Sequence, residues 1–95
     1  GLIYSLVLRL RGIYLMKIIL EKKDYSSPEF KQWIINETSL KKAEVENLYN
    51  CYKLERNNKR VKLKVPITSA EKLIFLLKKE VKDYDEKRKK ASKRN

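Results

Sequence analysis

Apolar residues recur every three or four positions over most of the chain, a period that predicts helices rather than strands. The first such stretch covers residues 2–23, and its apolar positions spread around nearly the whole circumference of a helix. A helix that is apolar on almost all sides is usually buried on almost all sides. A chain of 95 residues can hardly bury so long a helix completely. We therefore expect the surplus surface to face a neighbouring domain or a second copy of the chain.

This surplus surface predicts a homodimer through the first helix. A glycine inside a helix costs about 1 kcal/mol relative to alanine, so Gly12 is expected to permit close approach of another helix. The candidate interface residues are Leu2, Ile3, Leu6, Leu10 and Gly12.

A membrane span is not expected, although residues 2–20 have about the right length. Arg9, Arg11 and Lys17 would each cost about 2.5–3.5 kcal/mol near the centre of a bilayer.

Capping signals mark the starts of three further helices. Ser26 stands three residues before Glu29, a capping box that predicts a helix over residues 28–36. Thr38 or Ser39 is expected to cap a third helix over residues 41–56. Thr68 precedes the last predicted helix, 69–87, whose apolar residues follow the spacing of an amphipathic helix.

A basic segment joins the third and last helices. It alternates lysine or arginine with aliphatic residues, which is the pattern of an extended strand. No second strand is evident in the sequence, so we predict an extended connector. Its basic residues are Lys59, Arg60, Lys62 and Lys64.

Together these patterns predict an all-α fold, a compact four-helix bundle-like domain with an extended basic connector before the last helix. Only two glycines and two prolines argue against an all-β chain. The domain is expected over residues 1–86, as the C-terminal part of a longer protein, and a disordered basic tail over residues 87–95.

The composition limits which partners the chain can bind and which catalytic or metal sites it can form. The net charge is +12, with the excess in the first helix, the connector and the tail, which favours polyanionic partners. The chain has one cysteine and no histidine, so we expect no disulfide, no metal site and no cofactor. One unpaired cysteine also favours a reducing, cytoplasmic location. No nucleophile and base, paired carboxylates or phosphate-binding glycine loop forms a catalytic cluster.

Binding is therefore the expected activity, and the basic connector with the helix end before it is its predicted place. A helix-turn-helix is the alternative reading of residues 28–56, although Glu44, Glu46 and Glu55 weaken the electrostatic case for the second helix. The candidate contacts to phosphate or nucleic acid are Tyr52, Arg56, Asn57, Asn58, Lys59, Arg60, Lys62 and Lys64.

Four segments resemble the helical C-terminal domain of archaeal nucleotidyltransferase-like proteins: LRLRGIYL at 8–15, YSSPEFKQWI at 25–34, LYNCYKLERNNK at 48–59 and ITSAEKLIFLLKKEV at 67–81. The resemblance implies a helical bundle that follows a catalytic domain, with the carboxylates and the glycine-serine signature of the transferase upstream. It also implies that the helix ending at Tyr52–Lys59 faces substrate.

The expected function is that of a non-catalytic accessory domain, which positions or binds substrate, such as nucleotide or RNA, or interacts with a partner. An independent DNA- or RNA-binding module of helix-turn-helix type and a helical oligomerisation domain are the alternatives.

Overall fold

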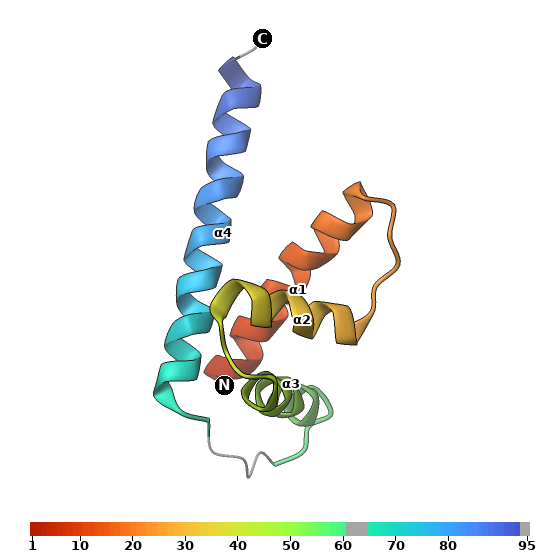
Figure 1. The fold of residues 1–95 in the computed structure, drawn as a ribbon, viewed down its shortest axis with the longest axis vertical. Coiled ribbons are helices and arrows are strands. Elements are labelled where there is room, and N and C mark those ends of the chain that lie inside the picture. The colour runs from red at the N-terminus through yellow and green to blue at the C-terminus, as the bar shows by residue number, and fades with distance from the viewer. Residues whose placement is uncertain (61–64, 94–95) are drawn as a thin grey trace.

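The computed structural model describes residues 1–60 and 65–93, and the side chains of all of these except 91–93. It contains four helices, α1 (Leu2–Leu20), α2 (Ser27–Thr38), α3 (Lys42–Arg56) and α4 (Ile67–Lys93) (Figure 1). The described residues form no strand, and the predicted all-α fold is confirmed.

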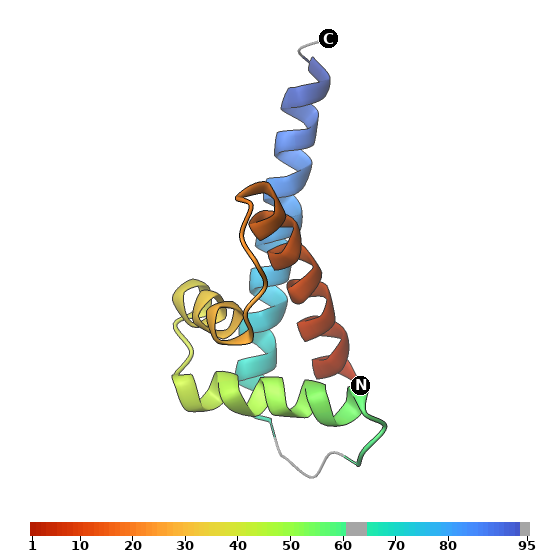
Figure 2. The ribbon, with the colours of Figure 1, turned by 90° about the vertical axis from the view of Figure 1, so that its right-hand side faces the viewer.

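The two long helices start close together and diverge. α1 and α4 run in the same general direction from their N-terminal ends, and the C-terminal half of α4 projects beyond the other helices (Figures 1 and 2). α3 crosses beneath the N-terminal ends of α1 and α4, and it is seen end-on in Figure 1 and from the side in Figure 2. α2 packs on α3 and contacts α4. The core lies where the four helices meet.

This core is built from aliphatic residues of every helix and from a run of aromatic rings. Leu10 and Phe30 are fully buried, and the ring of Phe30 lies 6.2 Å from that of Trp33. Tyr14 packs between these rings and Tyr25, with centroid distances of 5.3 to 6.4 Å. Edge-to-face and offset aromatic pairs of this kind add stability beyond their buried area.

The N-terminus of α2 is capped as predicted, whereas that of α3 is not. The amide of Glu29 donates to Ser26 Oγ at 3.5 Å. α3 begins after Lys41, which has no side-chain cap. Thr38 instead closes α2, because its hydroxyl donates to the carbonyl of Ile34 at 2.6 Å and accepts from the amide of Leu40 at 3.2 Å.

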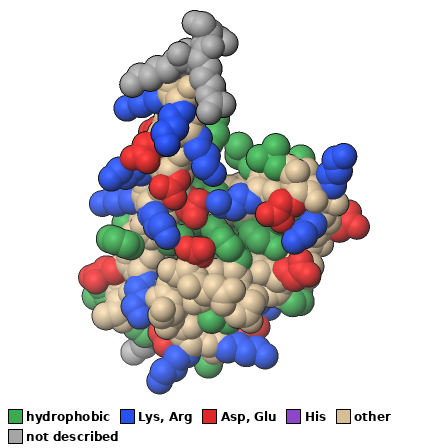
Figure 3. Space-filling view, turned by 45° about the horizontal axis from the view of Figure 1, so that its top comes forward, with side chains coloured by type: hydrophobic (Ala, Val, Ile, Leu, Met, Phe, Trp, Pro, Cys, Tyr) green, Lys and Arg blue, Asp and Glu red, His purple; other side chains and the backbone are tan. Residues whose placement is uncertain are grey.

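α4 is longer than predicted at both ends. It starts at Ile67, directly after Pro66, whose carbonyl accepts from the amides of Ser69 and Ala70, so Thr68 lies inside the helix instead of capping it. At the other end the backbone remains helical to Lys93, where the sequence analysis predicts a disordered tail from residue 87. Lysine, arginine, glutamate and alanine are good helix formers, which accounts for the extension. Charged side chains of both signs are interspersed along this projecting half (Figure 3).

Both α1 and α3 end in a Schellman motif, in which a residue with positive φ closes the helix. After α1, Lys22 has φ 57°, and the amides of Lys22 and Lys23 donate to the carbonyls of Ile19 and Ile18. After α3, Asn58 has φ 57°, a conformation that asparagine tolerates better than most residues.

The extended connector is described only at its ends. Lys59 and Arg60 follow the end of α3, and Val65 packs against the core. The predicted contacts Lys62 and Lys64 lie outside the described residues.

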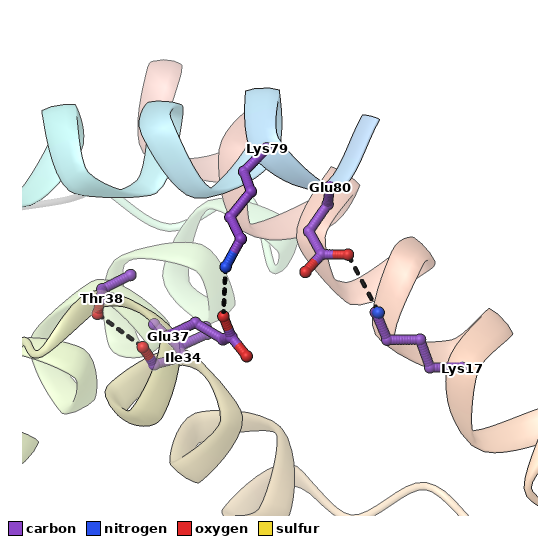
Figure 4. A network of polar contacts seen from close by, with 6 residues as sticks. All are labelled: Lys17, Ile34, Glu37, Thr38, Lys79 and Glu80. Carbon is purple, nitrogen blue, oxygen red and sulfur yellow. Dashed lines mark hydrogen bonds and ion pairs between the residues drawn. The ribbon is translucent and has the colours of Figure 1, made fainter. Parts of the chain in front are cut away.

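Two ion pairs fasten α4 to its neighbours (Figure 4). Lys17 of α1 lies 3.1 Å from Glu80, and Lys79 lies 3.3 Å from Glu37 of α2. Because Lys79 and Glu80 are consecutive, the two pairs fix the rotation of α4 about its axis.

Candidate polyanion-binding surface

One side of α3 places two cations over two tyrosine rings. Tyr49, Tyr52, Lys53 and Arg56 share this side, since helical residues three or four apart are neighbours. The guanidinium of Arg56 lies 5.5 Å from the ring centroid of Tyr52, and the ammonium of Lys53 lies 5.7 Å from that of Tyr49. Each cation is four residues after its tyrosine, so the helix itself sets the two contacts.

Two further cations reach the same place from other helices. The ammonium of Lys31 in α2 lies 4.7 Å from the ring centroid of Tyr49. Lys53 contacts the same ring. Arg11 of α1 lies 4.6 Å from the ring of Tyr25, whose hydroxyl is 3.3 Å from that of Tyr49. We call these residues the tyrosine–cation cluster: Arg11, Tyr25, Lys31, Tyr49, Tyr52, Lys53 and Arg56.

Two of the three carboxylates of α3 have partners on other helices. Glu46 pairs with Lys31 at 3.0 Å, and Glu44 accepts from the hydroxyl of Ser69 at 3.2 Å. The charge of Lys31 is therefore balanced by Glu46. Arg11, Lys53 and Arg56 form no ion pair among the described residues, so the cluster keeps a positive charge.

The tyrosines of the cluster are neutral and its arginines are charged near pH 7. Burial, followed by the hydrogen bond to Tyr49, raises the pKa of Tyr25 above its ordinary value. The contact with Tyr25 raises the pKa of Arg11. Arg11 Nε is buried and has no hydrogen-bond partner among the described atoms. Neutral hydroxyls and guanidinium groups are donors suited to phosphate oxygens.

Five of the predicted contacts are exposed at and after the end of α3: Arg56, Asn57, Asn58, Lys59 and Arg60.

For Tyr52 the structure corrects the prediction, because its side chain is only 2% exposed. Its ring stacks on Tyr4 at a centroid distance of 5.5 Å and belongs to the core, since an aromatic ring gains more from burial than from exposure. Tyr52 supports Arg56 from beneath and does not itself face a ligand.

The interface predicted on α1 is also partly wrong. Leu6 and Leu10 are 5% and 0% exposed and pack into the core of their own chain, while Ile3 is partly buried against it. Leu2 is 58% exposed. Gly12 is exposed, and a Cβ added there would meet nothing within 4 Å, so no described helix uses the glycine for close approach.

Sequence reasoning missed three cations of the cluster. Lys53 had a detectable signal, since it follows Tyr49 by four residues on a predicted helix. The sequence carries no signal for the contacts of Arg11 and Lys31, because only the packing of the helices brings these residues near Tyr25 and Tyr49.

A shallow depression between the start of α1 and the end of α3 does not offer a catalytic site. It is lined by Gly1, Leu2, Ile3, Cys51, Glu55, Lys59 and Val65. Burial raises the pKa of the Cys51 thiol, which keeps it protonated, and Glu55 is bound by the amine of Gly1.

Comparisons of the chain with protein-family models, with curated proteins and with solved structures gave no match. None of the described helices is long and apolar enough to cross a membrane. The described side chains form no group of three or more residues that could hold a metal ion.

Proposed function

We propose that this chain is a non-catalytic accessory domain that binds a nucleic acid strand through the tyrosine–cation cluster and the exposed basic residues after α3. One observation carries the proposal: Arg11, Lys53 and Arg56 lie over the rings of neighbouring tyrosines and form no ion pair among the described residues.

Contact with the tyrosine rings restricts the motion of these cations before any ligand binds. Stacking on an aromatic face holds a guanidinium or ammonium group in place, so less side-chain freedom is lost when a phosphate binds. Lys59 and Arg60 are exposed after the end of α3 and add two cations that can contact further phosphates. A single strand suits this surface better than a duplex, because it can follow the bend at the end of α3.

The accessory role rests on the resemblance to the C-terminal domains of archaeal nucleotidyltransferase-like proteins. In that role the domain holds the substrate strand while an upstream catalytic domain supplies the metal-binding carboxylates.

The experiment measures binding of labelled single-stranded RNA and duplex DNA at about 50 and about 200 mM salt. The variant Lys53→Ala/Arg56→Ala removes two cations of the cluster. Its matched control, Lys72→Ala/Lys82→Ala, removes two exposed cations from α4. We expect the first variant to bind RNA more weakly and to reduce the slope of log K against log salt by about 1.4, which is two phosphate contacts on a single strand.

The proposal fails if both variants lose affinity equally, because binding would then depend on net charge alone. It also fails if the unaltered chain binds neither nucleic acid.

The arrangement of α2 and α3 favours a helix-turn-helix function as the second candidate. The two helices cross in Figures 1 and 2 and are joined by the short turn at residues 39–41. Asn47 and Asn50 are exposed on α3, and asparagine can read adenine in the major groove. Under this function Asn47→Ala/Asn50→Ala lowers affinity for duplex DNA and leaves RNA binding unchanged, which separates it from the first proposal.

A further inference from the structure

α4 carries two apolar stripes, and only one of them faces the core. The buried side is formed by Ser69, Leu73, Leu76 and Glu80. The second stripe follows spacings of three and four residues in strict alternation, which is the repeat of a coiled-coil seam. We call it the heptad stripe: Ile67, Ala70, Ile74, Leu77, Val81 and Tyr84.

The heptad stripe is exposed towards its two ends and half-buried at its centre, where Ala70, Ile74 and Leu77 lie. Ile67, Val81 and Tyr84 are 77%, 47% and 53% exposed, and Ile74 and Leu77 are only partly buried at the edge of the core. α2 contacts the opposite side of α4. Lys79, which binds Glu37 of α2, points about 160° away from Leu77 and Val81 around the helix axis. α4 lies at one edge of the molecule in Figure 1. The stripe is therefore open to another molecule.

We propose that a second copy of this chain covers the heptad stripe, with the two α4 helices antiparallel. A two-fold axis between residues 75 and 76 pairs all six positions of the repeat. Ile74 of each copy lies opposite Leu77 of the other, Ala70 opposite Val81, and Ile67 opposite Tyr84. Every stripe position then faces an apolar residue of the other copy.

Charges beside the stripe support the same register. Glu71 directly follows Ala70, and Lys78 directly follows Leu77. In an antiparallel pair of helices, residues at these equivalent positions face each other across the seam. Glu71 of each copy therefore lies beside Lys78 of the other, which gives two attractive contacts.

These two charges have no partner on their own helix. The residues three and four positions from Glu71 and Lys78 include no group of opposite charge, and both side chains are exposed. Exchanging their charges should therefore affect the dimer much more than the folded monomer.

α1 also exposes apolar side chains, but they form no continuous heptad repeat. Arg9 and Gly12 interrupt the spacing between the exposed residues, which are Leu2, Leu8, Met16, Ile19 and Leu20. The homodimer predicted through the first helix is thus better placed on α4.

The first test is a charge exchange followed by sedimentation over a wide range of concentration. Glu71→Lys and Lys78→Glu each place like charges together and should weaken the dimer. The double variant Glu71→Lys/Lys78→Glu restores both attractive contacts and should recover the affinity of the unaltered chain. If the double variant is as weak as the single ones, the proposed register is wrong.

The second test compares two exposed apolar residues on the same helix. Val81→Glu puts a charge into the seam and should give a monomer. Phe75→Glu, at a residue 74% exposed outside the heptad stripe, is the matched control and should leave the dimer intact. Circular dichroism checks that both variants keep their helices. Equal effects of the two substitutions, or a monomer at every concentration of the unaltered chain, would overturn the proposal.

The third test measures the direction of pairing with spin labels on cysteines introduced at Lys72 or Glu86. The antiparallel register separates the two labels by about 10 Å along the helix axis at residue 72 and by about 32 Å at residue 86. A parallel dimer gives no axial separation at either residue and would exclude this arrangement. Mock labelling of the unaltered chain checks that buried Cys51 does not react. These readouts are independent of RNA binding, so either proposal can fail without the other.

Discussion

The ammonium group of Lys17 in α1 lies 3.1 Å from a carboxylate oxygen of Glu80 in α4, and the Glu80 side chain is only 7% exposed. Lys17 is 41% exposed, so the pair is buried on one side and solvated on the other. A carboxylate in that position is stabilised only while its cation is present. The pair therefore holds α1 against α4 where the two helices begin to separate (Figure 4).

We predict that Lys17→Met destabilises the fold by roughly 1–3 kcal/mol, because it leaves a buried carboxylate unpaired. The double variant Lys17→Met/Glu80→Leu should recover most of this loss, since an apolar pair can replace a buried ion pair. Urea unfolding measures the stability change in the single and in the double variant. Lys79→Ala, which breaks the more exposed pair with Glu37, serves as the control and should cost about 0–1 kcal/mol. A cost of Lys17→Met no larger than that of the control would show that Glu80 is solvated.

The helices could be predicted because apolar spacing and capping residues determine them locally. The contacts of the tyrosine–cation cluster could not be predicted in this way. Apolar spacing predicts each helix, and Ser26 and Asn58 act at helix ends as their chemistry implies. The start of α4 was misplaced because Pro66 begins a helix as readily as Thr68 caps one. These differences shift boundaries by a turn or two and leave the fold unchanged.

The candidate site depended on tertiary packing. Arg11 and Tyr25 lie fourteen residues apart in the sequence, yet the turn after α1 brings them into contact. Whether Tyr52 points to solvent or to the core depends on where α1 places Tyr4, which periodicity on α3 alone cannot decide. The exposed run after α3 was predictable, because a basic segment without apolar partners on its polar side stays at the surface.

Tyr52 and Arg56 should respond differently to substitution. Tyr52→Ala empties a core position and should cost about 3–5 kcal/mol of folding stability, as other aromatic truncations do. Tyr52→Phe keeps the ring and should leave RNA binding within twofold of the unaltered chain. Arg56→Ala should keep the stability within about 0.5 kcal/mol and weaken RNA binding. Urea unfolding and fluorescence anisotropy separate the two properties. A large loss of binding in Tyr52→Phe would restore this tyrosine as a ligand contact.

Gly12 provides a test of the first helix as an interface. A Cβ at this position meets nothing within 4 Å, so Gly12→Ala should stabilise the chain by about 0.5–1 kcal/mol through the lost freedom of the unfolded state. Thermal unfolding at low and high protein concentration measures the change. If another helix packs closely on Gly12 in a dimer, the substitution would instead destabilise the chain, and more so at high concentration.

Lys22 is a second place where a substitution should stabilise the fold. It adopts φ 57° at the end of α1, a conformation that costs a side-chain-bearing residue about 1 kcal/mol relative to glycine. Lys22→Gly should therefore raise the free energy of unfolding by a few tenths to about 1 kcal/mol. Asn58→Gly is the matched control at the same position after α3, and its gain should be smaller because asparagine tolerates this conformation. Equal gains would indicate that the side chain has little influence on either turn.

The stability of the fold should decline in mildly alkaline solution, and Cys51 should account for the first part of the decline. Burial, with a smaller effect of Glu55, raises the pKa of the Cys51 thiol above its ordinary value of 9.0. The unfolded chain then releases this proton at a lower pH than the folded chain does. The free energy of unfolding is thus fully maintained below the unfolded pKa and falls as the pH rises toward the folded one. Buried Tyr14 and Tyr25, whose pKa values are raised above 10.0, extend the decline to higher pH.

Urea unfolding at about pH 7.5 and about pH 9.5 brackets the ordinary range of the thiol. Cys51→Ala removes the titrating group, so its stability should fall less between the two pH values than that of the unaltered chain, whatever the cost of the substitution itself. A thiol reagent supplies the independent check, because a buried, protonated Cys51 should react slowly in the folded chain and rapidly in urea. An equal decline in both proteins would mean that the thiol ionises alike in the folded and unfolded states and that the loss comes from the tyrosines and lysines.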